Sequence, residues 1–239
     1  SELATAIPKS GGAYVYIERS FGPILGTIAG LGLWGSLLLK SSFALVGLGA
    51  YFTVLFNFPS LDIRYVSIIF LIIIVLLNIL GVKKVGKVQL VIVLLSLIGL
   101  SSILILGYTE SNLTTGNSFL LDGNYGLVST IAFVYMSYAG VTKVAAIAGE
   151  VKKPEINLPI AMIGSLIIIA LIYISISYTL VEHISISNLK NDTKPLYTLA
   201  ETLGGSTFAF IIAIVGVITL FSMANSGMLA TSRFPFAMS

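Results

Sequence analysis

The sequence contains no cysteine and few charged residues, and both absences exclude classes of protein. A chain without cysteine forms no disulfide and offers no thiolate for catalysis or zinc binding. Its single histidine, His183, cannot hold a metal ion alone, so we expect no metal site and no cofactor. Charged residues make up 10% of the 239 residues, whereas a soluble domain carries roughly 25%. The chain is therefore expected to lie in a membrane.

Apolar residues dominate what is present. They account for 56% of the chain, and the mean hydropathy is +1.02. They form long runs, and about 20 apolar residues are what an α-helix needs to cross a bilayer. The polar stretches 109–126 and 182–201 indicate loops, and Pro159 indicates the first turn of a helix. The sequence thus predicts an all-α polytopic membrane protein with one transmembrane domain over residues 1–239. Its helices are expected at about 21–56, 65–80, 88–108, 127–148, 159–181 and 207–231.

The helix at 127–148 is expected to be broken near residues 138–140. Leu127 to Ser137 is about eleven residues, or roughly 16 Å of helix, which is half of an apolar layer ~30 Å thick. The small residues that follow allow the backbone to leave helical geometry, and hydrocarbon tolerates this only beside protein or a water-filled cavity. A discontinuous helix at this depth is typical of a transporter binding site. Alternatively, the small residues only allow a neighbouring helix to pack closely.

Three motifs carry a resemblance to a known family. The small-residue break is followed by an alanine-rich segment and then by E-V-K-x-P-x-x-N-x-P. Near the start, residues 8–23 contain P-x-S-G-G-x-Y-x-Y followed by F-G-P, and residues 232–238 read S-R-x-x-x-A-M. This chain therefore resembles the amino acid, polyamine and organocation (APC) superfamily of permeases, from the end of the second helix through the eighth. It departs from the family at Thr142, where many members have an acidic residue. The residues matching the family's sixth helix are Gly140, Glu150, Val151, Lys152, Pro154, Asn157 and Pro159.

The resemblance implies both a fold and a function. The implied fold is part of a transporter with two inverted five-helix repeats, in which the broken first and sixth helices hold the substrate. The first helix is not within residues 1–239. The implied function is secondary active transport of an amino acid, by a symporter or antiporter, and not catalysis by an enzyme. The expected substrate-binding residues are Met136, Ser137, Tyr138, Ala139, Gly140, Val141 and Thr142 at the break, together with Ser36 and Asn225.

Two lysines within the expected helices are candidates for proton coupling. Lys40 lies deep in its helix, where an ammonium costs about 2.5–3.5 kcal/mol, so we expect it to face a cavity with Ser36 one turn away. Lys143 would lie in the first turn after the break, where the helix dipole and desolvation oppose its charge. Lys40 could instead make only a structural contact, and Lys143 could point into a cytoplasmic vestibule.

The coupling ion is expected to be a proton rather than sodium. Both lysines can titrate, and no carboxylate lies inside an expected span, although serine hydroxyls and backbone carbonyls can also hold sodium. In the fifth helix of some APC members a lysine stands in for a sodium ion. Ser96 occupies roughly that place here, so this particular device is missing.

Lysine and arginine are distributed unevenly between the loops. One alternating set of loops holds eight of them and the other set holds three, and positively charged loops stay inside the cell. We therefore expect a multi-pass protein of the cell membrane. Its expected partners are an amino acid, a proton and the lipid bilayer, without nucleic acid, and the oligomeric state is left open. The segments expected in the cytoplasm are 1–20, 81–87, 149–158 and 232–239.

Other kinds of membrane protein are weighed against this prediction. The sequence has no glycine-rich phosphate loop of an ATP-driven pump, and no paired carboxylates or Ser/His arrangement at one membrane depth for hydrolysis. A pore-forming or purely structural six-helix protein, or a truncated permease that does not transport, is the main alternative. The sequence does not begin with methionine, and both of its ends are expected to be internal to a longer protein.

Overall fold

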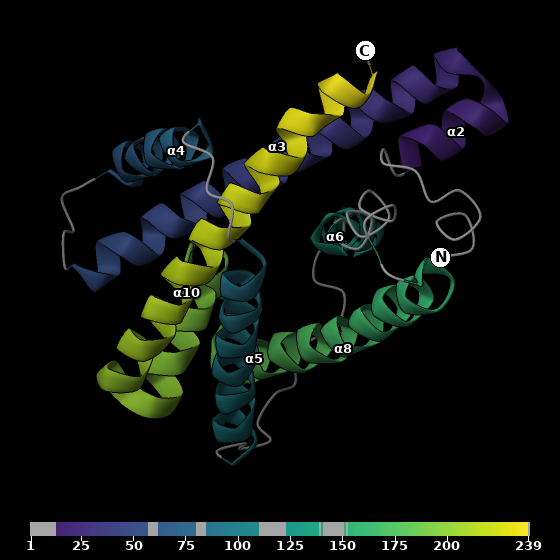
Figure 1. Ribbon diagram of the computed structural model, residues 1–239. Coiled ribbons are helices and arrows are strands. Elements are labelled where there is room, and N and C mark those ends of the chain that lie inside the picture. Colours follow the sequence, from purple (N-terminus) through teal and green to yellow (C-terminus); the bar gives the residue numbers. More distant parts are fainter. Residues whose placement is uncertain are drawn as a thin grey trace. The chain divides into compact units, whose positions relative to one another are not determined.

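The structure, a computed structural model, describes residues 13–56, 62–79, 85–109, 123–138, 140, 151 and 153–238. For 13, 85–87, 123–125, 136 and 233–238 it describes the backbone alone. The described part of the chain contains helices and no strand, which confirms the predicted all-α class (Figure 1). The helices are α2 (Ala13–Phe21), α3 (Pro23–Leu55), α4 (Ile63–Ile79), α5 (Val85–Thr109), α6 (Gly123–Tyr138), α8 (Pro154–His183), α9 (Ile186–Leu189) and α10 (Pro195–Met238).

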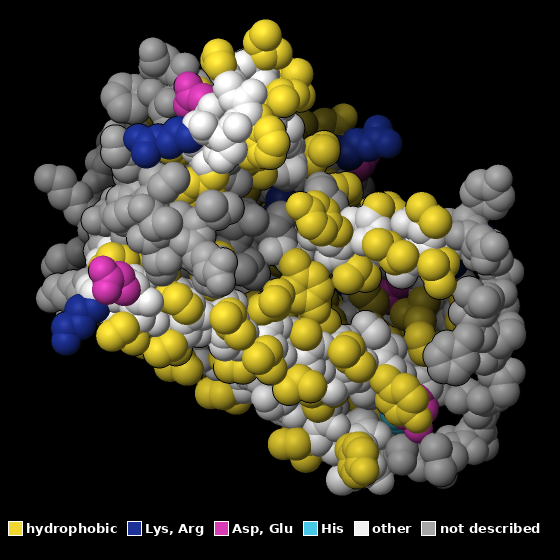
Figure 2. Space-filling model, turned by 90° about the vertical axis from the view of Figure 1, so that its right-hand side faces the viewer, with side chains coloured by type: hydrophobic (Ala, Val, Ile, Leu, Met, Phe, Trp, Pro, Cys, Tyr) yellow, Lys and Arg dark blue, Asp and Glu magenta, His cyan; other side chains and the backbone are white. Residues whose placement is uncertain are grey.

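The length and surface of these helices fit a bilayer. Among the described residues, four helical segments are long and apolar enough to cross a membrane, and they belong to α3, α5, α8 and α10. On α8, the large side chains Ile167, Ile168 and Leu171 are each more than half exposed. Figure 2 shows hydrophobic side chains over much of the described surface, with few charged ones. Because water would penalise so much exposed apolar surface, these helices fit a multi-pass membrane protein.

The start of α8 differs from the sequence-based expectation. The helix begins at Pro154, and Pro159 lies inside it rather than in its first turn. Lys153 has a positive φ of 49°, and its carbonyl accepts the backbone N–H groups of Ile156 and Asn157. Proline at the first helical position costs nothing, because that N–H has no intrahelical partner. Pro159 removes only one further bond, to the carbonyl of residue 155, so the helix continues through it.

The stretch 182–201 is also not the simple polar loop that was expected. It contains α9, and α10 begins within it at Pro195. Asp192 fixes this start, since its carboxylate accepts the backbone N–H of Lys194 at 2.8 Å and the hydroxyl of Thr198 at 2.6 Å. The apolar residues that follow are spaced for one helical face, and this periodicity outweighs the polar residues between them.

The described chain forms two compact units. Unit 1 contains the described residues within 1–40, 116–171 and 227–239, and unit 2 contains those within 41–115 and 172–226. In unit 1, α2 and α3 meet at Gly22, whose φ of 88° suits glycine alone. One turn later, a Cβ on Gly26 would lie only 2.7 Å from the Cβ of Glu18, so α3 packs there directly on α2.

Unit 2 has an apolar core built from α5, α8 and α10. Its central residues are at most 8% exposed, and they come from segments far apart in the sequence. A row of rings adds to this packing, because Phe70 lies edge-on to both Phe52 at 5.2 Å and Phe221 at 6.2 Å between ring centroids. The core residues are Ile103, Ile176, Ile184, Leu199, Ala200, Leu203, Ala209 and Ile212.

Candidate functional site

The candidate site lies in unit 1, where α6 ends. The helix stops at Tyr138, and Gly140 lies in a turn. The hydroxyl of Ser137 donates a hydrogen bond to the carbonyl of Phe133 at 3.1 Å, one turn back along α6. The last four carbonyls of a helix have no partner within it, and together they carry the negative end of the helix dipole. The end of α6 is therefore suited to a cation or a hydrogen-bond donor.

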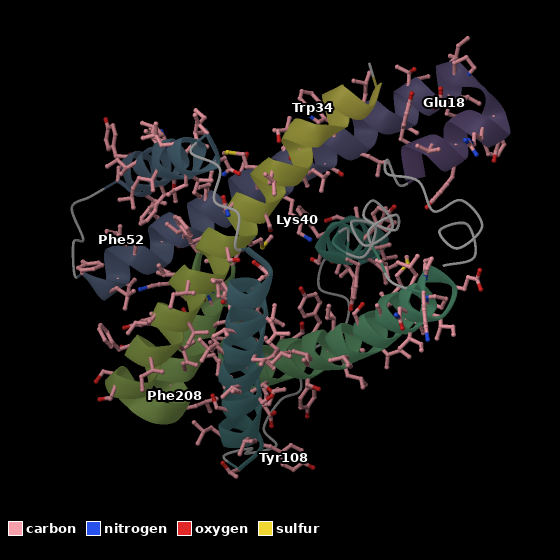
Figure 3. The ribbon with its side chains drawn as sticks, in the orientation of Figure 1. Glu18, Trp34, Lys40, Phe52, Tyr108 and Phe208 are labelled. Atoms are coloured by element: carbon pink, nitrogen blue, oxygen red, sulfur yellow. The ribbon has the colours of Figure 1, made fainter. Side chains whose placement is uncertain are left out.

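Lys40 supplies such a cation from α3. Its Nζ donates a hydrogen bond to the carbonyl oxygen of Ser137 at 3.3 Å, although 97 residues separate the two in sequence. Figure 3 shows the Lys40 side chain directed toward α6. Seventeen residues of α3 precede Lys40 and fifteen follow it, so it lies near the middle of a span. Placing a charged ammonium at the centre of a membrane helix costs about 2.5–3.5 kcal/mol. The hydrogen bond to Ser137 offsets part of this cost for the half-buried ammonium of Lys40.

Gly140 completes this group of three residues. A Cβ built on Gly140 would lie 3.5 Å from the Nζ of Lys40, which is ordinary van der Waals contact. A methyl group would therefore fit at this position, whereas a longer side chain would meet the ammonium. The site therefore brings three features within contact distance. They are the positive charge of Lys40, the end of α6 at Ser137, and Gly140, which has no side chain.

The other predicted site residues are placed only in part. Ser36 lies one turn before Lys40 on α3, and its hydroxyl bonds to the carbonyl of Leu33 at 2.8 Å. Tyr138 is the last residue of α6 and is half-buried. The side chain of Met136 and the whole of Ala139, Val141, Thr142 and Lys143 lie outside the described residues.

Asn225 lies in unit 2, where it belongs to a polar seam along α10. Its side-chain oxygen accepts a hydrogen bond from the amide of Asn78 in α4 at 2.7 Å. Earlier in α10, the hydroxyls of Thr219 and Ser96 are 2.6 Å apart, and Ser222 donates to the side chain of Gln89. The sequence analysis assigned no role to these partners, although polar residues recurring every three or four positions along α10 mark one helix face.

Comparison with known proteins decides the family. The family model described as "Amino acid permease" matches residues 1–239. The chain belongs to the amino acid permease family. This confirms the resemblance to the APC superfamily and the multi-pass membrane character of the chain.

Several curated proteins are similar to this permease chain over its full length. The serine/threonine exchanger SteT of Bacillus subtilis is 31% identical, over 100% of this chain and 55% of SteT. The branched-chain amino acid permease BcaP of Lactococcus lactis is 25% identical, over 99% of this chain and 56% of BcaP. The aromatic amino acid transport protein AroP of Escherichia coli is 24% identical, over 99% of this chain and 54% of AroP. The permease chain thus spans about half the length of these relatives.

Proposed function

We propose that this chain is part of a secondary active amino acid transporter of the cell membrane, and that the substrate binds where α6 ends. Its membership of the amino acid permease family supports transport over a pore-forming or purely structural role. The names of three relatives refer to different amino acids: serine and threonine, branched-chain, and aromatic. The proposal therefore specifies an amino acid and leaves its side chain open.

One observation carries the proposed site, namely the contact of Lys40 with the carbonyl of Ser137 beside Gly140. A small zwitterion can bind at a site that offers the carbonyl end of a helix, a charged group and a glycine that lets other groups approach the backbone. Beyond Gly140, the first N–H groups of a second half-helix would attract the carboxylate or backbone oxygens of the amino acid. Met136, Val141, Thr142 and the other residues of the expected site remain part of this proposal.

Lys40 is our first candidate for proton coupling. When its amine is protonated, it holds the end of α6 through the Ser137 carbonyl, and when it is neutral this interaction weakens. If the substrate binds to the ordered end of α6, protonation favours binding, and binding favours protonation by the same factor. Lys143 remains the second candidate, because the amine there would lie near the expected substrate carboxylate. Sodium coupling is the less favoured alternative.

The charge distribution supports one orientation of the protein. We propose that residues 1–20, 81–87, 149–158 and 232–239 are cytoplasmic, because the loops that contain them hold most of the lysine and arginine. The described residue Lys153 is exposed at the start of α8, in a proposed cytoplasmic loop. Asn191 is exposed between α9 and α10, on the proposed outer side.

A graded substitution at Gly140 tests the proposed site in the full-length protein reconstituted into vesicles. Gly140→Ala should retain saturable amino acid uptake, since its Cβ would lie 3.5 Å from the Lys40 amine. Gly140→Leu should abolish uptake and binding at every pH, because its longer side chain fills the space beside the backbone. Gly164→Ala, where nothing lies within 4 Å of a new Cβ, is the matched control.

Two results would contradict the proposal. Normal binding by Gly140→Leu would show that the substrate site lies elsewhere. An unsaturable leak of many solutes through the wild-type protein would favour the pore-forming alternative instead.

A further inference from the structure

The segments that build the proposed substrate site carry charge of one sign only. Lys40 is the single charged residue of α3, which has no aspartate or glutamate. α6, which supplies the Ser137 carbonyl, has no charged residue. From Gly140 to position 149 the sequence again has no acidic residue, and the one charged residue in that stretch is Lys143. The charge that the chain brings to this site is therefore positive.

Unit 1 has two carboxylates among its described side chains, and neither forms an ion pair with Lys40. Glu18 lies against Gly26, fourteen residues before Lys40, which is roughly 21 Å along α3. Glu155 is exposed in the first turn of α8, two residues after the exposed Lys153. The Lys40 ammonium bonds instead to an uncharged group, the Ser137 carbonyl. Its positive charge is thus not balanced by a described carboxylate.

The contacts of the ammonium show where this charge acts. The Nζ of Lys40 lies 3.3 Å from the carbonyl oxygen of Ser137 and 3.5 Å from a Cβ built on Gly140. Figure 3 shows the side chain directed toward α6. Because the rest of α3 is uncharged and apolar, a charge at this depth is screened far less than one on a wet surface. An amino acid beside Gly140 would therefore bind within the field of Lys40.

We propose that Lys40 sets the charge selectivity of the transporter. The site accepts amino acids with a neutral or anionic side chain and excludes those with a cationic side chain. This inference rests on the proposed substrate site at the end of α6 and adds the class of amino acid that the site takes. The α-ammonium and α-carboxylate are common to all amino acids and cancel in net charge. The side chain therefore decides whether Lys40 attracts or repels the substrate as a whole.

Coulomb's law gives the size of the expected discrimination. Two unit positive charges about 8 Å apart, at an effective dielectric constant of about 20, disfavour binding roughly 30-fold. The loss of hydration of a cationic side chain on entering the site disfavours it further. Removing the charge of Lys40 abolishes the repulsion and leaves the hydration cost unchanged.

Pairs of amino acids that differ in charge and hardly in size measure this selectivity. Suitable pairs are homoserine with 2,4-diaminobutyrate, norleucine with lysine, and citrulline with arginine. Each would displace the amino acid identified by an uptake screen from the full-length protein in vesicles, at the pH of tightest binding. The pair whose neutral member displaces it is used. The ratio of its dissociation constants, cationic over neutral, should be at least roughly 30 in the wild-type protein.

Three variants assign the selectivity to the charge of Lys40. Lys40→Met should lower the ratio roughly 30-fold, whereas Lys40→Arg, which keeps the charge, should preserve it. A weaker hold on the end of α6 affects both members of a pair equally, so it cancels in the ratio. Lys153→Met is the matched control, because Lys153 is an exposed lysine of the same unit, and it should leave the ratio unchanged.

The proposed selectivity and the proposed site fail in different ways. A wild-type protein that binds both members of a pair equally well would overturn the selectivity, whether or not the variants accumulate. An unchanged ratio in Lys40→Met, with binding lost in Gly140→Leu, would reject the selectivity and keep the site. Normal binding by Gly140→Leu would remove the site and the selectivity together. If Lys40→Met does not accumulate, Lys40→Gln takes its place with the same expected ratio.

Discussion

Replacing Lys40 with methionine tests how the end of α6 is held. Methionine keeps an unbranched apolar side chain and removes the ammonium that contacts the Ser137 carbonyl at 3.3 Å. A hydrogen bond from a charged donor contributes about 1.5–3 kcal/mol, and this one is longer than the usual charged pair at roughly 2.7–2.9 Å. We therefore use about 1.5 kcal/mol and add about 0.3–0.5 kcal/mol for the helix dipole. The sum, about 1.8–2.0 kcal/mol, corresponds to a loss of substrate affinity of at most roughly 20- to 30-fold.

The sign of the pH effect follows from which form of Lys40 makes the contact. The wild-type protein should bind its amino acid most tightly where Lys40 is protonated, and its Kd should rise with pH toward that of Lys40→Met. Lys40→Met should bind weakly with a flat pH profile. Lys40→Arg should bind tightly with a flat profile, because a guanidinium does not lose its proton in this range.

The assay is equilibrium binding between pH 5 and 9 with the full-length protein, using the amino acid identified by an uptake screen. Ser165→Ala is the control, because it removes a hydroxyl that bonds to Met162 within its own helix and does not belong to the proposed site. A Lys40→Met variant that retains the wild-type pH profile would refute the reasoning. Loss of pH dependence in Lys143→Met alone would then place the proton site after the break.

Two further predictions concern orientation and helix packing. A cysteine at Lys153 should react with an impermeant thiol reagent only from the cytoplasm, and one at Asn191 only from outside, since loops rich in lysine and arginine stay inside; the opposite labelling would reverse the topology. A double-mutant cycle of Asn78→Ala and Asn225→Ala, followed by unfolding in detergent, should give a coupling energy of about 0.6 kcal/mol and at most about 1.7 kcal/mol, as found for hydrogen bonds between membrane helices. The cycle of Asn78→Ala with Ser102→Ala should show no coupling, because Ser102 bonds to Gly99 within its own helix. Equal coupling in both cycles would show that the Asn78–Asn225 hydrogen bond is not its cause.

One wrong prediction, the loop over residues 182–201, could have been avoided from the sequence alone. The stretch 182–201 was expected to be a loop because polar residues are frequent in it. Leu196, Leu199, Ala200 and Leu203 nevertheless recur at helical spacing, and the last three are at most 7% exposed in unit 2. The signal was present, and the start of α10 could have been predicted from periodicity alone.

The sequence by itself determined the membrane environment, the all-α class and the family. These depend on local properties: long apolar runs need a bilayer, backbone groups in lipid must pair within a helix, and the motifs around Gly140 are continuous in the chain. It also singled out Lys40, because a charge near the middle of an apolar helix is costly wherever it points.

Only the tertiary structure decided which groups meet. Lys40 and Ser137 are 97 residues apart, and Asn78 and Asn225 are 147 residues apart. The contact of Tyr51 with Gly216 likewise joins separate helices. Nothing in the periodicity of one helix specifies the rotation and depth at which it packs against another, because in lipid all helices present similar apolar surfaces. Small residues and hydrogen-bonding side chains select the packing partner, and they do so only once the helices are in contact.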